Sequence, residues 1–568
     1  MTPVYFGKCF GWLHPAAGGR GVVVCSAIGL EDLCTHRFMR HLAEELSDAG
    51  MPTLRFDYEG TGDSSGTDRD PDQVKQWLAS IVQAIMLLQD TFGIQEVALV
   101  GFRLGALLAA EITQQLTSIS MLALLGAPIS GKSYLREMKA LGILIAQGSR
   151  INTQANEQPG EIEVAGFRYT APTIAELQQL DLLKLARKPA DKVLIMGRPH
   201  SANDERLLTH LRSLGCEAEH QVLPGYADLE WNSSFDELPE DAFSSLAQWL
   251  QQAMPPTIKP AKAIGATSLS TPDWQEDAVQ FGPQQNLFGI RCQPAHAQNR
   301  KLLLFVNHGA NHHIGWARLH VTLARQMAAV GIASLRMDIS GVGDSPARPG
   351  LPENLLYARH SQLDVHAALD WLKEQGYETI TLIGHCAGAY LGFYSTLRDK
   401  RIDNLVMLNL QRFFWARGET LADATQKSFR SSGWYWSALR DSQLWRRLFT
   451  GKVNITGIAM MMSQRILQRG AAELTPIVGP LVGYEGPSQK VVRWLRELTA
   501  RGTHVMLVYS AGDGGLDEIA KHTGSNARKI RQLANVHYHI LEGADHNLTQ
   551  RPAQQQYAKM LQEFLLTY

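Results

Sequence analysis

A cysteine stands at the centre of the pentapeptide Gly-His-Cys-Ala-Gly, residues 384–388, where its thiol is well placed for covalent chemistry. An apolar run precedes the pentapeptide and a helix-forming run follows it, which predicts a strand, a tight turn and a helix. The glycines suit a strained turn and a close approach of the helix to the strand. The turn would present the Cys386 thiol at a helix N-terminus, beside backbone N–H groups that can stabilise an oxyanion. Attack of this thiol on a carbonyl carbon would give a thioester intermediate.

A similar pentapeptide, Gly-Phe-Arg-Leu-Gly at residues 101–105, also lies between an apolar run and a helix-forming run. Its central residue is Arg103, and a guanidinium stays protonated in proteins and cannot attack a carbonyl. Arg103 could bind an anion such as a phosphate or carboxylate, and pairing with Asp228 or Asp57 is the alternative. We therefore expect two similar halves, of which only the second carries a nucleophile.

Other segments repeat in the same order in both halves. The pattern Arg-x-Asp-x-x-Gly-x-Gly-Asp-Ser occurs at residues 55–64 and again at 336–345. A Phe-Gly pair stands upstream of each copy, and so does a short apolar run. Strand and helix patterns alternate in each half, which predicts a mostly parallel sheet with helices on both faces.

The length of 568 residues suits two large α/β domains rather than one core. Residues 254–263 are rich in Pro, Lys and Ala and lack apolar periodicity, so we interpret them as part of a linker. The expected domains are residues 1–254 and 277–568, joined by a linker over 255–276.

Composition limits the class of protein. Apolar residues make up 45% of the chain, charged residues make up 19%, and the formal net charge is -1, so nothing global indicates binding to nucleic acid. The six cysteines are scattered, without metal-type spacing, as is typical of a reducing compartment. No signal peptide is evident and no apolar stretch is long enough to span a membrane. We expect a cytoplasmic protein with no cofactor.

In its strand and helix context, the 384–388 pentapeptide resembles the nucleophile elbow of the α/β-hydrolase superfamily. The second half resembles hydrolase-like and acyltransferase-like members with a Gly-His-Cys-x-Gly elbow and an Asn-Leu-Gln-Arg-Phe-x-Trp run, here residues 409–415. The first half resembles hydrolase-like proteins associated with exosortase and exopolysaccharide gene sets. The resemblance implies two tandem α/β-hydrolase folds, with a cap insertion in the second at about residues 411–487.

The superfamily order of nucleophile, acid and histidine implies the rest of the site. Asp513 and His546 each follow a buried-strand pattern, and Asp517 is the alternative acid. His546 would take the thiol proton or pair with the thiolate, and Asp513 would orient the imidazole. The oxyanion hole would use the backbone N–H of Ala387, with a second donor from Ala310 or a neighbour.

Substrate contacts are expected in the same loop and in the cap. His312 and His313 follow Ala310 closely, and Trp415 begins an aromatic and arginine-rich cap that suits an apolar acyl group. Adjacent histidines on a loop seldom chelate one ion together, so we expect no metal. The cap arginines could dock an acidic acyl carrier protein or the phosphates of a thioester donor.

The first half lacks the other catalytic residue types as well. Its acid position falls near His200, and its base position is occupied by Tyr226 or Asp228. Loss of the nucleophile, the acid and the base together predicts a scaffold rather than a second active site.

Three functions fit these patterns. The leading hypothesis is an acyl-transfer enzyme that takes an acyl group from a CoA or carrier-protein thioester onto Cys386 and passes it to an acceptor. With water as the acceptor, the same Cys-His-Asp site would make a thioesterase or esterase. A non-enzymatic scaffold is the third hypothesis.

Overall fold

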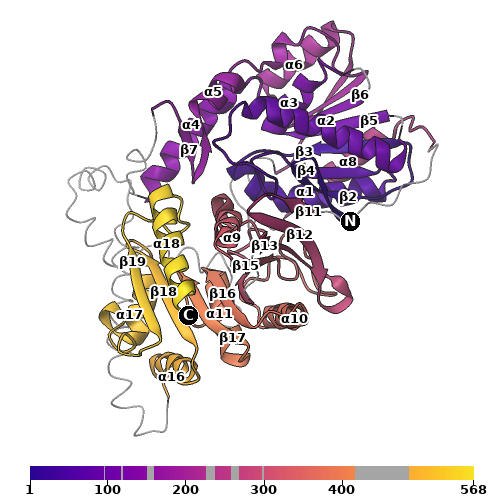
Figure 1. Ribbon diagram of the computed structural model, residues 1–568. Helices are drawn as coiled ribbons and strands as arrows, with labels where there is room; N and C mark the ends of the chain where they lie inside the picture. The colour runs from indigo at the N-terminus through magenta and orange to yellow at the C-terminus, as the bar shows by residue number, and fades with distance from the viewer. Residues whose placement is uncertain are drawn as a thin grey trace, which may run out of the picture. The chain divides into compact units, whose positions relative to one another are not determined.

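The computed structural model in Figure 1 describes residues 1–94, 96–116, 119–149, 159–225, 237–256, 268–296, 300–415 and 485–568. Within these ranges, no helix is both long and apolar enough to cross a bilayer. The cap predicted at about 411–487 lies mostly outside the described residues, and so do Tyr226 and Asp228.

The first half contains an eight-stranded sheet in the order β1-β2-β4-β3-β5-β6-β9-β10. β1 and β2 are antiparallel, β2 joins β4 antiparallel, and the remaining pairs are parallel. The strands are β1 (Thr2–Phe6), β2 (Cys9–His14), β3 (Arg20–Cys25), β4 (Thr53–Asp57), β5 (Glu96–Phe102), β6 (Ile119–Leu125), β9 (Lys192–Gly197) and β10 (Glu217–Val222). A separate antiparallel pair consists of β7 (Ile162–Val164) and β8 (Phe167–Tyr169).

Helices cover both faces of this sheet, as the alternation of its side chains requires. The helices are α1 (Leu30–Asp48), α2 (Gln73–Phe92), α3 (Leu104–Ile112), α4 (Gly131–Ser149), α5 (Ala171–Leu177), α6 (Ala202–Ser213) and α8 (Glu240–Gln251). Val22 and Val24 of β3 pack in one core with α1 and α8. Val23, between them, points to the opposite core, which includes side chains of α2 and α3. Burial on both faces explains why three consecutive residues of β3, Val22 to Val24, are apolar rather than alternating with polar ones.

The second half contains a nine-stranded sheet in the order β11-β12-β13-β15-β14-β16-β17-β18-β19. The strands are β11 (Ser268–Ser270), β12 (Trp274–Phe281), β13 (Leu287–Pro294), β14 (Lys301–Phe305), β15 (Ala333–Met337), β16 (Thr379–His385), β17 (Ile402–Leu408), β18 (His504–Ser510) and β19 (Val536–Leu541). The ladders from β15 through β14 to β19 are parallel. The helices are α9 (Leu319–Ala329), α10 (Ser361–Glu374), α11 (Ala387–Arg398), α16 (Pro487–Ala500), α17 (Gly515–Thr523) and α18 (Arg551–Thr567).

The two sheets have the same topology. Apart from β11, the strand order of the second sheet matches that of the first position by position, so that β5 corresponds to β16. Each of these two central strands runs into a pentapeptide singled out in the sequence, followed by α3 or α11. The prediction of two mostly parallel sheets with helices on both faces is confirmed.

The contacts within the chain define two compact units, and these are not separated by a single linker as the sequence predicted. The first compact unit comprises residues 1–279, 290–295 and 310–325, and the second comprises 280–289, 296–309 and 326–568. Within the linker predicted over 255–276, residues 257–267 are outside the described ranges. Residues 268–270 and 274–276 belong to strands of the second sheet.

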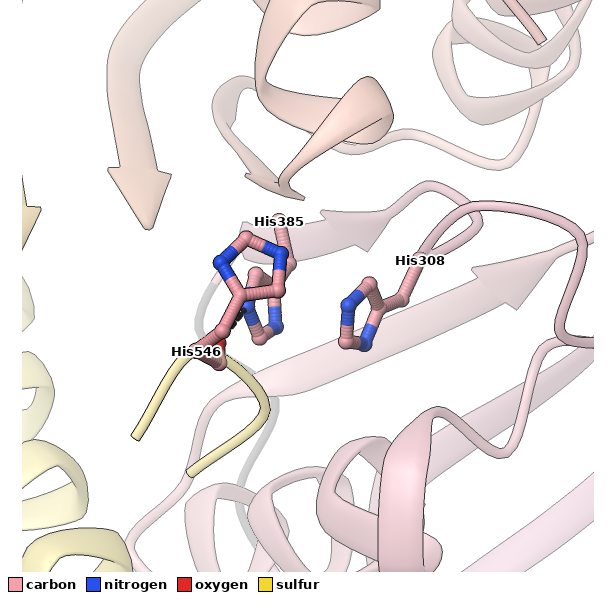
Figure 2. A group of neighbouring side chains, drawn as sticks. All are labelled: His308, His385 and His546. Atoms are coloured by element: carbon pink, nitrogen blue, oxygen red, sulfur yellow. Dashed lines mark hydrogen bonds between the residues drawn. The ribbon is translucent and has the colours of Figure 1, made fainter. Parts of the chain in front are cut away.

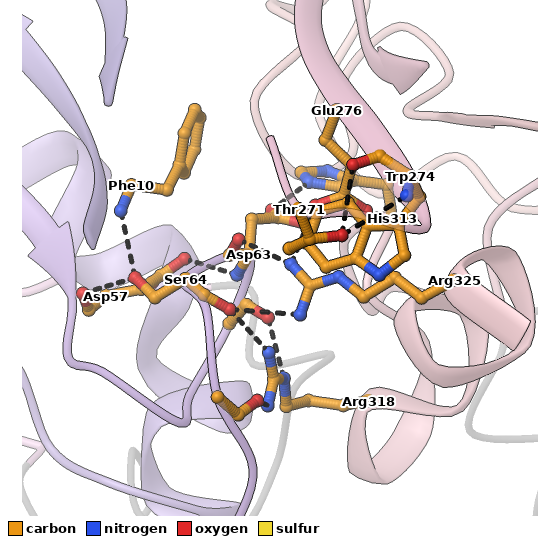
Figure 3. Close-up of polar contacts among 12 residues, drawn as sticks. Phe10, Asp57, Asp63, Ser64, Thr271, Trp274, Glu276, His313, Arg318 and Arg325 are labelled. Atoms are coloured by element: carbon orange, nitrogen blue, oxygen red, sulfur yellow. Dashed lines mark hydrogen bonds and ion pairs between the residues drawn. The ribbon is translucent and has the colours of Figure 1, made fainter. Parts of the chain in front are cut away.

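The segment 310–325 is held in the first unit by polar contacts that Figure 3 shows. The Arg318 guanidinium donates hydrogen bonds of 2.7 to 3.1 Å to four backbone carbonyls within residues 60–66. Arg325 donates to the carbonyl of Asp63 and to the carboxylate of Glu276. His313 lies 2.6 Å from the Asp63 carboxylate, and both side chains are buried. A stretch placed in the second half by its sequence position is therefore packed with the first unit.

Candidate active site

The turn at residues 384–388, the second elbow, places Cys386 between β16 and α11. Cys386 has φ 55° and ψ −114°, a strained conformation for a residue with a side chain. Its N–H donates to the carbonyl of Leu408 at 2.9 Å. A side chain at Gly384 would clash with the backbone of Gly388, and one at Gly388 would clash with the carbonyl of Asn307. The glycines are therefore required by close backbone approach, as the sequence predicted.

His546 lies beside this cysteine and is held by Asp513. The Nδ1 atom of His546 is 2.6 Å from Oδ2 of Asp513, whose side chain is fully buried. Because a carboxylate only accepts hydrogen bonds, Nδ1 carries a proton and Nε2 is the nitrogen left to serve the thiol. The charges of Asp513 and of an ionised Cys386 both act on the His546 imidazole. The structure thus brings together the nucleophile, base and acid named from the sequence, and it favours Asp513 over Asp517.

The electrostatics around His546 favour its protonated form. Burial alone would lower the pKa of His546, but the charges of Asp513 and of the Cys386 thiolate outweigh it and hold that pKa well above its usual value. An imidazolium beside the sulfur stabilises the thiolate, which is the reactive form of cysteine.

Gln411 supports the acid, a role that the sequence analysis missed. Its side-chain amide donates to Oδ1 of Asp513 at 2.6 Å, and the N–H of Gly515 donates to the same oxygen at 2.7 Å. With His546 on Oδ2, both oxygens of the buried carboxylate have hydrogen-bond donors.

Asn409 and His385 hold the backbone of the histidine loop. The carbonyl of His546 lies 2.8 Å from Nδ2 of Asn409 and 2.6 Å from Nε2 of His385. Asn409 also exchanges hydrogen bonds with Ser510 at the end of β18. One feature of the sequence could have indicated this role. Asn409 and Gln411 are amide residues just after the buried strand β17, and polar residues of parallel sheets gather at such strand ends.

Three imidazoles meet in this region, as Figure 2 shows, with His308 and His385 close to His546. The rings of His308 and His385 stack at 3.6 Å between centroids, with 18° between their planes. A ring nitrogen binds a metal in the plane of its ring, and two nearly parallel stacked rings cannot both direct lone pairs at one ion. The arrangement therefore suits packing of the loop that carries His308 rather than a shared metal.

An aromatic group lies near the nucleophile. Burial raises the pKa of Tyr357 well above its usual value, and the negative charge of an ionised Cys386 raises it further. Trp415 stacks on Tyr357 at 4.0 Å with 3° between the ring planes, and Tyr390 meets it edge-on at 5.1 Å. Arg412 lies over the other ring of this stack, 5.6 Å from the centre of Trp415. Trp415, expected to bind substrate, thus packs on Tyr357, and its role as a substrate contact stays a prediction.

The remaining residues named from the sequence divide between the two units. Ala387 begins α11 directly after Cys386. Ala310, His312 and His313 belong to the first unit by their contacts. There the ring of His312 stacks on His36 at 3.8 Å and His313 binds Asp63, contacts that fit packing. Ala310 as an oxyanion donor, and the two histidines as substrate contacts, stay predictions.

The first elbow, residues 101–105, has the same backbone but a different chemistry. Arg103 has φ 53° and ψ −119° and is almost fully buried. Its guanidinium is 2.7 Å from the carboxylates of both Glu31 and Glu137. The sequence had suggested Asp57 or Asp228 as ion-pair partners. The carboxylates found beside Arg103 within the described residues come from α1 and α4, and Asp228 lies outside those residues. Two acidic neighbours leave Arg103 poorly suited to bind an anion.

Comparisons with known proteins agree with this fold. Residues 23–158 and 298–412 match the sequence family described as serine aminopeptidase, S33, and the two segments contain the first and second elbows. Both halves have the α/β-hydrolase fold. No curated protein matches the chain. The family match supports an enzyme of hydrolase type, whereas the cysteine nucleophile and the likeness to exosortase-associated proteins stay predictions.

Solved structures with some similarity include esterases and a lipase. The esterase Est1E of Butyrivibrio proteoclasticus, with ferulic acid bound, has 14% identity and a TM-score of 0.32, over 44% of this chain and 98% of its own. The esterase Pf2001 of Pyrococcus furiosus has 14% identity and a TM-score of 0.32, over 44% of this chain and 91% of its own. A monoglyceride lipase variant of Saccharomyces cerevisiae, with a substrate analogue, has 15% identity and a TM-score of 0.33, over 45% and 96%.

Proposed function

We propose that this protein is an acyl-transfer enzyme in which Cys386, His546 and Asp513 form the catalytic triad. The observation that carries the proposal is a thiol at a strained helix N-terminus, near a histidine that lies 2.6 Å from a buried carboxylate and whose pKa an ionised Cys386 raises. The proposed donor is a thioester of CoA or of a carrier protein.

In the first step, the Cys386 thiolate would attack the donor carbonyl, and the N–H of Ala387 would stabilise the oxyanion. When the tetrahedral intermediate collapses, the bond to the donor sulfur breaks and the His546 imidazolium gives its proton to the departing thiolate. The neutral imidazole then takes a proton from the acceptor, which attacks the acyl-cysteine. Expulsion of the Cys386 thiolate restores the starting ion pair.

The choice of cysteine favours transfer. A thioester on Cys386 has about the same acyl-transfer potential as a thioester donor, so the group can still be passed to an amine, hydroxyl or thiol. Arg412, beside the aromatic stack, is one cation near the site that could meet an anionic carrier.

Hydrolysis is the second candidate because the matched family is one of hydrolases. The same residues would serve, with water in place of the acceptor. The two candidates differ only in the fate of the acyl-cysteine, so the intermediate is the species to measure.

Intact-mass analysis after incubation with acyl-CoA and acyl-carrier thioesters tests the proposal. We expect an adduct that hydroxylamine removes, that Cys386→Ala abolishes and that Cys34→Ala, at another partly exposed thiol, leaves unchanged. An adduct that persists in buffer and disappears when an amine or thiol acceptor is added indicates a transferase. Rapid decay in buffer alone indicates a hydrolase, and failure of every donor to react contradicts both.

A further inference from the structure

The short segment after β17 passes beside the proposed catalytic acid. Residues 410–415 lie outside the helices and strands, and side chains from α11 and α17 hold their backbone. Phe413 is fully buried, and its N–H donates to Oε1 of Glu518 at 3.1 Å. Its carbonyl accepts from the hydroxyl of Tyr394 at 2.8 Å. Two side chains thus fix the backbone two residues after Gln411.

Glu518 is itself held in place and charged. It lies on α17 with 16% of its side chain exposed, and Nε2 of His522, one turn further along the helix, is 3.1 Å from its Oε1. Burial alone would raise the pKa of Glu518, but the hydrogen bond and the charge of His522, with the charge of nearby Lys521, lower that pKa to about 2. A carboxylate that stays ionised at working pH is a strong acceptor for a backbone N–H.

One continuous piece of chain carries both the acid and this acceptor. Asp513 stands just after β18, and Glu518 follows it on α17. Asp513 accepts from the amide of Gln411 at 2.6 Å, and Glu518 accepts from the N–H of Phe413 at 3.1 Å. Two residues of extended chain reach only about 7 Å, so the position of Phe413 limits where the Gln411 amide can lie.

We propose that Glu518 is a positioning residue for the catalytic acid and that it acts through Phe413 and Gln411. By holding the Phe413 N–H, it keeps the Gln411 amide on Oδ1 of Asp513, and Oδ2 then stays directed at Nδ1 of His546. The inference rests on the acyl-transfer function proposed above and deepens it, because it names a residue that supports the acid without touching the reacting atoms.

Loss of the Gln411 amide would leave the acid less well held. Oδ1 of Asp513 would keep the N–H of Gly515 at 2.7 Å as its donor. A buried carboxylate with fewer donors binds a proton more readily and orients the imidazole less strictly. Because a hydrogen bond to a charged group is lost, we expect acylation to slow by about tenfold.

The test is a double-variant cycle with Glu518→Leu, Gln411→Leu and the two combined. Asp517→Leu is the matched control, because it removes the neighbouring carboxylate of the same helix. The first measurement is the rate at which iodoacetamide alkylates Cys386 across pH, read by mass. It needs no acyl donor, so it decides this inference even if no thioester reacts and the proposed function fails.

The pH profile of alkylation reports the thiolate, and hence the imidazolium beside it. Each single variant should displace this profile by the same amount, since each changes the charge that Asp513 presents to His546. The combined variant should be displaced no further, and the Asp517→Leu control should match the unaltered protein.

The second measurement is the rate of acylation by a thioester donor, with the free energy of unfolding measured in parallel. We expect a loss of about tenfold in Glu518→Leu, in Gln411→Leu and again in the combined variant. Glu518→Gln keeps an oxygen that can accept from the Phe413 N–H and an amide that can meet His522. It should therefore restore both the acylation rate and the alkylation profile.

Additive losses, with about 100-fold in the combined variant, would overturn the proposal, because the two residues would then act independently. An unchanged alkylation profile in either single variant would do the same. If Glu518→Leu does not fold, Tyr394→Phe takes its place in the cycle, since it removes only the hydroxyl that donates to the Phe413 carbonyl. Its smaller displacement should vanish in the Gln411→Leu background, and a displacement that persists there would contradict the coupling.

Discussion

Arg103 and Cys386 have nearly the same backbone conformation, with φ of 53° and 55° and ψ of −119° and −114°. Each N–H donates to the carbonyl at the end of the neighbouring strand, at 3.0 Å and 2.9 Å. Each turn also contains a glycine, Gly105 or Gly388. A side chain there would clash with the backbone at the end of β3 or just after β14. The two elbows share their backbone geometry, and only the second carries a side chain that could act as a nucleophile.

The turns that follow β4 and β15 agree equally well. Ser64 donates to the carbonyl of Asp57 at 2.7 Å, and Ser345 donates to that of Asp338 at 2.8 Å. The N–H of a phenylalanine in β2 or β13 donates to each serine at 2.9 Å. Strained elbows and buried turns are thus properties of the fold. We expect reactivity to depend on the side chains near the central residue of each elbow. In the second half these are a histidine and its carboxylate, whereas in the first half two carboxylates pair with the guanidinium of Arg103.

The largest difference between the halves should appear when the acid position is changed. Asp513→Asn offers an amide N–H to Nδ1 of His546, which favours the wrong imidazole tautomer, and it removes the charge that raises the pKa of His546. We expect acylation of Cys386 to slow by about 100-fold or more. The raised pKa of His546 keeps its imidazolium protonated to higher pH in the unaltered protein. Without the charge of Asp513, the imidazolium should lose its proton at a lower pH, which the pH dependence of Cys386 alkylation would show.

The control for this substitution lies at the corresponding position of the first half. His200 is exposed at the end of β9, and His200→Ala should change neither acylation nor alkylation of Cys386. An equal loss of rate in both variants would mean that the first half takes part in the chemistry.

The ion pair of the first elbow should matter for stability instead. Arg103→Met leaves Glu31, whose side chain is fully buried, without the guanidinium that it faces. We expect a loss of about 3 kcal/mol in the free energy of unfolding, measured by chemical denaturation. The double variant Arg103→Met with Glu31→Leu should recover most of the loss, since it removes both charges. If the double variant were as unstable as Arg103→Met alone, the result would mean that Arg103 stabilises the fold mainly through Glu137.

The smallest expected effect is a loss of stability, and it should be the same in both halves. Ser64→Ala and Ser345→Ala each leave a buried backbone N–H without its acceptor. We expect each to lower the free energy of unfolding by about 1 to 3 kcal/mol. A large loss in one half and none in the other would show that the two turns do not bear the same structural role.

The sequence indicated the features that demand particular residue types. A tight turn between strand and helix needs glycines, and a buried strand needs an apolar run, so both elbows and both sheets could be predicted. Cys386, Asp513 and His546 were named from the superfamily order of nucleophile, acid and histidine, and their catalytic roles stay a proposal. Gln411 and Asn409 were missed because their partners are distant in the chain, as with Gln411 and Asp513. Nothing in a local pattern marks such contacts.

The placement of residues 310–325 could not be predicted for a different reason. Arg318 binds backbone carbonyls within residues 60–66, and every sequence has such carbonyls. An arginine that recognises main-chain oxygens leaves no complementary residue to find. The boundary between the two units therefore depends on where main-chain carbonyls lie in the folded protein. No residue pattern in the sequence marks it.

The central claim is that the partners of the elbow residue, and not the elbow itself, make the site reactive. The direct test is to place a thiol in the first elbow by Arg103→Cys, in a full chain that also carries Cys386→Ala, and to incubate it with acyl thioesters. Glu31 and Glu137 would face the introduced thiol and disfavour its thiolate, so we predict no hydroxylamine-labile adduct at position 103, whereas the unaltered protein is acylated at Cys386. An adduct at position 103 that forms as fast as the one at Cys386 would contradict the account.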